Sequence, residues 1–129
     1  MKEDSIRQIM NAYDHLNVAL VGIGTADNTS SAFRSGYYSD EMKQQAVKDQ
    51  VCGDICMHLF DKEGRTDCFP YNKQIVGVNL NKLKKVPYAI GIASGVRKAE
   101  AIRGAIKGGY INVLVTDAQC GQALTRLND

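Results

Sequence analysis

Apolar and polar residues follow two different spacings along this chain. Apolar positions three or four residues apart predict helices over residues 2–16, 39–49, 80–86, 96–107 and 117–127. Short apolar runs bounded by glycine, proline or polar residues predict strands over residues 18–23, 54–60, 74–78, 88–93 and 111–115. Residues 25–36, which are rich in Ser, Thr, Asn and Asp, predict a loop.

The second half of the chain indicates the fold class. Strand, helix, strand and helix follow one another there with short connections, which is the pattern of a βαβ unit and requires parallel strands. The length of 129 residues suits one domain. We therefore expect an α/β fold, a Rossmann-like parallel sheet with helices on both faces.

Composition excludes several classes of protein. Hydrophobic residues make up 44% and charged residues 23%, an ordinary balance for a globular domain. No apolar run approaches the ~20 residues that a membrane helix needs, and the charged N-terminus shows no signal-peptide pattern. None of the four cysteines forms a Cys-x-x-Cys pair, which favours reduced cysteines and a cytoplasmic location.

Positive charge is concentrated in one stretch. Residues 82–107 carry seven basic and one acidic side chain, within a chain whose net charge is +2. Such a stretch is typical of contacts with phosphate, nucleic acid or an acidic partner, and equally of a solvated face that binds nothing.

Residues 93–98 join an expected strand to an expected helix, where open parallel sheets bind ligands. Gly95 has no Cβ, so backbone N–H groups can approach a ligand closely. Ser94 adds a hydroxyl, and Lys98 adds a positive charge where a helix start already favours anions. This junction predicts a site for an anionic small molecule. A tight turn that needs glycine for its geometry alone is the alternative.

Four further residues are candidates for the same site. Asp54 opens an apolar strand, where its carboxylate either accepts hydrogen bonds from sugar hydroxyls or merely ends a turn. Arg34 offers a bidentate phosphate contact, or is solvated. Gly24 and Thr25 follow the first expected strand, and Thr25 is a candidate polar contact. The pattern around Gly24 lacks the third glycine of a dinucleotide fingerprint, so NAD binding is rejected.

The candidates for metal binding and catalysis are weaker. Cys52, Cys56 and His58 would share one face of a regular strand, but structural zinc sites prefer closer cysteine pairs. No set of nucleophile, base and orienting group is evident. We therefore expect no metal, no cofactor and no catalytic residue.

Three segments taken together resemble a known family. They are GDICMHLFD (53–61), KVPYAIGIASGVRKAEAI (85–102) and GGYINVLVTD (108–117), and VGIG (21–24) and FRSGY (33–37) fit as well. In order and spacing they resemble the sugar-binding domain of the SorC family of bacterial transcriptional regulators. The resemblance covers about residues 16–127.

The resemblance implies a fold like that of sugar-phosphate isomerases and CoA transferases, and a phosphorylated sugar as effector. The family's ligand-site lysine would fall on Lys98, its acidic sugar contact on Asp54 and its loop arginine near Arg34. Ser94 departs from a glycine that is common in the family. Effector binding would change DNA affinity and the homo-oligomer.

Family regulators are more than twice as long as this chain, and their helix-turn-helix has no counterpart here. We therefore expect residues 1–129 to be one partial effector domain, with DNA bound only through an absent N-terminal domain. The alternative is a sugar-phosphate isomerase, for which Asp54 or Asp117 would be the base, but no partner acid is evident.

Overall fold

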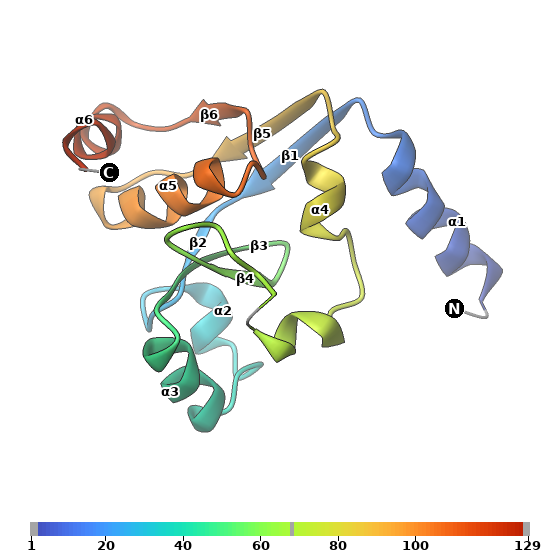
Figure 1. The fold of residues 1–129 in the computed structure, drawn as a ribbon, viewed down its shortest axis with the longest axis horizontal. Helices are drawn as coiled ribbons and strands as arrows, with labels where there is room; N and C mark the ends of the chain where they lie inside the picture. Colours follow the sequence, from blue (N-terminus) through green and yellow to red (C-terminus); the bar gives the residue numbers. More distant parts are fainter. Residues whose placement is uncertain (1–2, 68, 128–129) are drawn as a thin grey trace.

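The computed structural model describes residues 3–67 and 69–127, so Lys2 and Cys68 lie outside the described residues. Its three parallel strands are β1 (Val18–Gly22), β5 (Tyr88–Ile92) and β6 (Val113–Val115), in the order β1-β5-β6 (Figure 1). The expected α/β fold with a parallel sheet is thereby confirmed, as are the expected strands at these three places.

A small antiparallel sheet was not expected from the sequence. It consists of β2 (Gly24–Thr25), β3 (Val51–Ile55) and β4 (His58–Asp61), in the order β2-β3-β4. The prediction of one strand over residues 54–60 is therefore wrong. Cys56 and Met57 adopt positive φ angles of 51° and 67° and turn the chain back on itself. Cys52, Cys56 and His58 consequently do not share one face of one strand.

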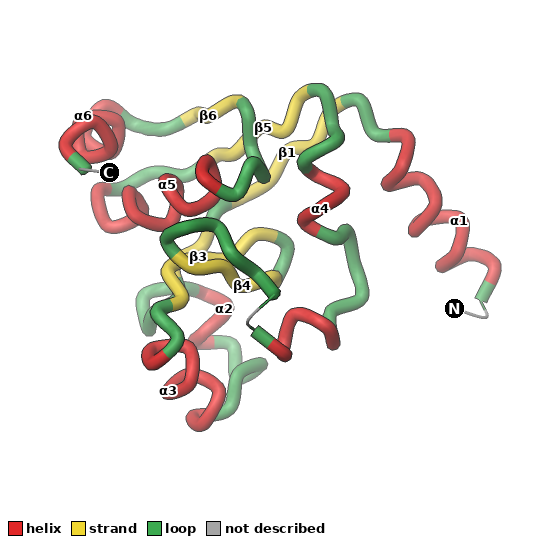
Figure 2. Tube along the Cα trace, in the orientation of Figure 1, coloured by secondary structure: helices red, strands yellow, loops and turns green. Residues whose placement is uncertain are grey.

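The helices agree more closely with the sequence pattern. The α-helices are α1 (Asp4–Ala12), α2 (Ser31–Arg34), α3 (Asp40–Lys48), α4 (Leu80–Leu83), α5 (Ala99–Lys107) and α6 (Ala118–Arg126), and short 3-10 helices are η1 (Tyr13–His15), η2 (Pro70–Gln74) and η3 (Val96–Lys98) (Figure 2). Ser39 and Asp117 are the N-caps of α3 and α6, because their side chains accept hydrogen bonds from the N–H groups of Met42 and Cys120.

Two local expectations are wrong. Residues 74–78 form no strand. Gln74 is the last residue of η2, and residues 75–79 after it are irregular. The expected loop over residues 25–36 contains β2's Thr25 and the helix α2. Ser30 caps α2 by accepting a hydrogen bond from Phe33 N, and Phe33 is buried, which fixes this turn of helix against the core.

The main hydrophobic core lies on one side of the parallel sheet, where α4, α5 and the antiparallel sheet pack (Figure 1). Phe60 from β4, Ile102 from α5 and Leu83 from α4 are almost fully buried there against Ala19 and Ala89 of the parallel sheet. This packing holds the carboxyl end of β1 beside β2, β3 and η3.

The other face of the parallel sheet is exposed in the described residues, so the expected helix cover on that face is not seen. Alternate residues of each strand point away from the core, and Leu20 is 66% exposed. The exposed apolar side chains of this face, called the open face below, are Val18, Leu20, Tyr88, Ile92, Val113 and Val115. Among residues 3–67 and 69–127, no helix is long and apolar enough to cross a membrane.

Candidate functional site

A cavity of about 490 Å³ lies where β1 ends and β2 begins. Four of the residues expected at the site line it: Gly24 and Thr25 from β2, Asp54 from β3 and Lys98 from η3. The cavity lies within the size range of small-molecule sites, ~300–1,000 Å³. Residues from distant parts of the sequence therefore meet at the carboxyl end of β1, where parallel sheets bind ligands.

Gly24 allows the Asp54 carboxylate to occupy its position. The two residues are paired in the antiparallel ladder between β2 and β3. A Cβ placed on Gly24 would overlap Asp54 Oδ1, whereas one placed on the nearby Gly22 would meet nothing within 4 Å. Gly24 thus leaves room for the Asp54 carboxylate, which a side chain at position 24 would displace.

We expect Gly24→Ala to lower the free energy of unfolding by about 1–3 kcal/mol, because the new methyl group must displace Asp54 or the β2 backbone. Gly22→Ala is the matched control, and its effect should stay within about 0.5 kcal/mol. Urea denaturation of the two variants measures both values. Equal stability losses would contradict this account of Gly24.

Asp54, Arg97 and Lys98 are the charged residues among those that line the cavity. Burial raises the pKa of Asp54 above its ordinary value, although the charge of Lys98 opposes this shift. Lys98 Nζ donates a hydrogen bond to Ile23 O at 2.8 Å. The partly desolvated carboxylate is a strong acceptor for hydroxyl donors, because hydrogen bonds to charged groups are stronger than neutral ones.

A hydroxyl-rich network from the loop before α2 lies at the same cavity. Thr25 Oγ1 donates to Asp27 Oδ1 at 3.1 Å, and Thr29 donates to the same oxygen from its backbone N at 2.9 Å and from its hydroxyl. These hydrogen bonds, chiefly that of the Thr29 hydroxyl, lower the pKa of Asp27. Arg97 Nη1 donates to Thr29 Oγ1 at 2.7 Å, which ties η3 to this loop.

Three expected site residues lie outside the cavity lining. Arg34 is exposed at the end of α2, and Ser94 is exposed after β5. Gly95 has a φ of 99°, and its N–H donates to Asp117 Oδ2 at 2.6 Å. That N–H therefore already has an anionic acceptor from the protein itself.

Several lining residues were not anticipated from the sequence. They are Thr29, Ser30, Tyr37, Met57 and Arg97. The run of hydroxyl residues between β2 and α2 was a signal for the first two. Arg97 was visible only as part of the basic stretch.

The basic stretch does not act as one unit in the structure. Lys82 pairs with Asp14 at 3.0 Å, and Lys107 pairs with Glu63 at 3.2 Å. Lys84 Nζ lies over the Tyr110 ring, 5.3 Å from its centroid. These lysines therefore have partners within the protein.

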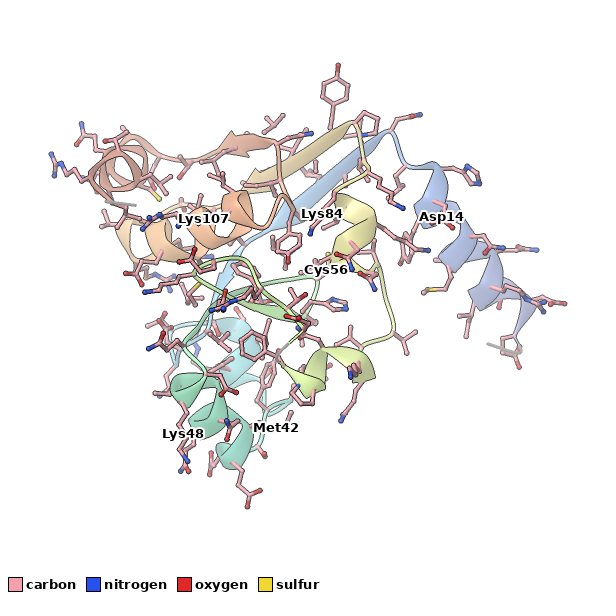
Figure 3. All side chains as sticks on the ribbon, in the orientation of Figure 1. Asp14, Met42, Lys48, Cys56, Lys84 and Lys107 are labelled. Carbon is pink, nitrogen blue, oxygen red and sulfur yellow. The ribbon has the colours of Figure 1, made fainter. Side chains whose placement is uncertain are left out.

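Within the described part of the chain, no group of three or more His, Cys, Asp and Glu residues is placed to hold a metal ion. Burial raises the pKa of the Cys52 thiol to about 12 and the pKa of Cys56 above its ordinary value. Both cysteines are therefore protonated thiols at neutral pH. Cys56 is labelled in Figure 3.

Comparison with protein families gives a match over nearly the whole chain. The family described as "Putative sugar-binding domain" matches residues 1–126. The deoxyribonucleoside regulator of Bacillus subtilis is 36% identical over 123 residues, which cover 95% of this chain and 39% of that protein. The sorbitol operon regulator of Klebsiella pneumoniae is 32% identical over 126 residues, covering 98% and 40%.

Solved structures show the same fold. The full-length sorbitol operon regulator SorC of Klebsiella pneumoniae matches with a TM-score of 0.88 and 33% identity, over 98% of this chain and 41% of that chain. A DeoR family transcriptional regulator of Listeria monocytogenes matches with a TM-score of 0.89 and 26% identity, over 95% and 50%. The chain thus spans about 40% of the length of the curated relatives it matches.

Proposed function

Because the chain belongs to the sugar-binding domain family of SorC-family transcriptional regulators, we propose that its cavity binds a phosphorylated sugar as a regulatory effector. The observation that carries the proposal is the half-buried Asp54 carboxylate, within electrostatic reach of Lys98, in a cavity that Arg97 also lines. A carboxylate accepts hydrogen bonds from sugar hydroxyls, and basic side chains bind phosphate.

The proposal extends to the longer regulators. We propose that binding of the sugar phosphate modulates DNA affinity through a separate domain, and two observations support this: a relative is named sorbitol operon regulator, and this chain covers 40% of it. We propose a cytoplasmic location for the same reason, because transcription regulators act on bacterial DNA. The function is binding without catalysis. Among the described residues that line the cavity, Asp54 is the one carboxyl group, whereas an isomerase needs a base and a partner acid.

A thermal-shift panel tests the proposal. The purified chain is mixed with the phosphates of fructose, glucose, ribose and sorbitol and with the same four sugars without phosphate. A ligand that binds only the folded state raises the melting temperature. We expect at least one sugar phosphate to do so, and more than its unphosphorylated sugar does. No shift with any of the eight compounds would contradict the proposal.

The pH dependence of binding follows from the raised pKa of Asp54. Hydroxyl donors need the ionised carboxylate, so affinity should fall as the pH falls through the pKa of Asp54. Because burial raises that pKa, the loss should begin above the ~3.9 of an ordinary aspartate. Calorimetric titrations between about pH 7 and pH 4 measure it. Affinity that is constant until the protein unfolds would contradict the role of Asp54.

We also propose that copies of this chain associate through the open face. Parallel sheets are normally covered on both faces, and a contiguous apolar patch on three neighbouring strands is typical of an interface. The open face presents six exposed apolar or aromatic side chains, so a second identical face can pack against it. A homo-oligomer accounts for this surface.

Leu20→Asp is expected to dissociate the oligomer, because it places a charge in the middle of the buried apolar surface. Val47→Asp on α3, where Val47 is 73% exposed, is the control. Sedimentation equilibrium should show association for the unmodified chain and for the control, and a monomer for Leu20→Asp. A monomeric unmodified chain would contradict association through this face.

A further inference from the structure

Two neighbouring basic residues, Arg97 and Lys98, line the cavity, and their surroundings differ. Lys98 is half-buried, its Nζ donates to Ile23 O, and its charge lies within electrostatic reach of the Asp54 carboxylate. Arg97 is exposed, and its guanidinium donates to the neutral hydroxyl of Thr29. The positive charge of Lys98 therefore lies near a half-buried carboxylate, whereas the carboxylate nearest in charge to Arg97, that of Asp27, is exposed to solvent, and the hydrogen bond of Arg97 goes to a neutral hydroxyl.

We propose that Arg97 binds the phosphate of the sugar and that Lys98 is a positioning residue, which holds Asp54 charged and oriented for the sugar hydroxyls. This inference rests on the proposed function, and it separates the site into a phosphate end and a hydroxyl end.

The cost of moving each cation supports this division. If Lys98 turned toward a phosphate, it would give up its hydrogen bond to Ile23 O and reduce the favourable interaction of its charge with the half-buried Asp54, whose desolvation opposes ionisation. If Arg97 turned toward a phosphate, it would give up one hydrogen bond, to the Thr29 hydroxyl. That hydroxyl also donates a hydrogen bond to Asp27. Thr29 would therefore keep a hydrogen-bond partner after Arg97 had moved.

Charge repulsion favours the same arrangement. A phosphate next to Asp54 would place two anions together in a partly desolvated cavity, which is unfavourable. Arg97 donates its hydrogen bond to Thr29, in the loop between β2 and α2, whereas Asp54 lies on β3. Asp27 also lies within electrostatic reach of Arg97, but it is exposed, so solvent screens its repulsion of a phosphate more than it does that of the half-buried Asp54. The planar guanidinium is suited to bidentate phosphate binding.

The test compares each sugar with its own phosphate. The dissociation constants of ribose and ribose 5-phosphate, and of glucose and glucose 6-phosphate, are measured by calorimetry, and their ratio defines the phosphate preference. Arg97→Gln should reduce this preference by about tenfold to a hundredfold, the value of a hydrogen bond between charged groups. Arg97→Lys should restore part of it, because the charge returns without the bidentate geometry.

Lys98→Gln should weaken both members of each pair by the same factor and leave the preference unchanged. If Lys98→Gln fails to fold, as judged by circular dichroism, Lys98→Met keeps the aliphatic stem and serves instead. Lys48→Gln on α3, far from the parallel sheet (Figure 3), also removes one positive charge and should change nothing. It controls for a general loss of attraction between the protein and an anion.

Two results would overturn the inference. The first is that Arg97→Gln has the same phosphate preference as Lys48→Gln. The second is that the Lys98 variant loses the phosphate preference while Arg97→Gln retains it. If the unmodified chain binds no sugar and no sugar phosphate, the proposed function itself fails. That result differs from both of the others.

Discussion

Replacing Asp54 by asparagine is expected to weaken binding of a phosphorylated sugar by about a hundredfold. A hydrogen bond to a charged acceptor contributes about 1.5–3 kcal/mol, and each ~1.4 kcal/mol is a factor of ten in affinity. Two hydroxyl contacts to the carboxylate at the lower value account for the hundredfold. Asparagine has nearly the same shape, so the cavity beside Gly24 keeps its form.

Asp40→Asn, at an exposed position in the first turn of α3, is the matched control for Asp54→Asn. It removes one carboxylate charge away from the cavity and should leave the affinity unchanged. Isothermal titration of both variants gives the comparison. Unchanged affinity of Asp54→Asn would mean that Asp54 does not contact the ligand.

The stability of Asp54→Asn separates a binding role from a structural one. Burial raises the pKa of Asp54, so the folded protein gains stability when Asp54 is protonated and loses it as the pH rises through that pKa. At neutral pH the carboxylate is ionised at a cost in folding free energy. An asparagine there should therefore not lower the free energy of unfolding, and a residue that binds ligand at the expense of stability is typical of functional sites.

Replacing Phe60 by alanine is expected to lower the free energy of unfolding by about 3–5 kcal/mol. Phe60 is fully buried on β4, and its ring lies 5.9 Å from that of Tyr110. It packs between the antiparallel sheet and α5, which carries Ile102 into the same core. Small domains are stable by only about 5–15 kcal/mol, so this loss would remove much of the total.

Val47→Ala on α3 is the control for Phe60→Ala, because Val47 is 73% exposed and its truncation removes little buried surface. Urea denaturation followed by circular dichroism measures both variants. If Phe60→Ala were as stable as Val47→Ala, that result would contradict the packing of β4 against α5 described above.

Local chemistry made part of the fold predictable. Ser39 and Asp117 are residue types that favour the N-cap position, they stand in front of apolar helical patterns, and both cap their helices in the structure. The β3–β4 hairpin was missed because Cys56 and Met57 occupy the left-handed region, where glycine or asparagine is the usual signal. The sequence therefore contained no turn residue at the place where the chain reverses.

The candidate site was predictable where a residue stood out in its own segment. Asp54 is a lone charge in an apolar stretch, and Lys98 follows a strand end, and the structure brings both to one cavity. Arg97 was missed because its contact with Thr29 joins residues 68 positions apart. Arg34 was included as a loop cation, but it lies outside the lining because α2 carries it to the surface.

The most direct test of the central claim is an NMR titration of the ¹⁵N-labelled chain with the sugar phosphate that gives the largest thermal shift. We predict saturable shifts of the backbone amides of Gly24, Thr25, Thr29 and Arg97, and no shifts in α3. Perturbations confined to residues away from this cavity, or no saturable perturbation by any sugar phosphate of the panel, would contradict the assignment of the cavity as the effector site.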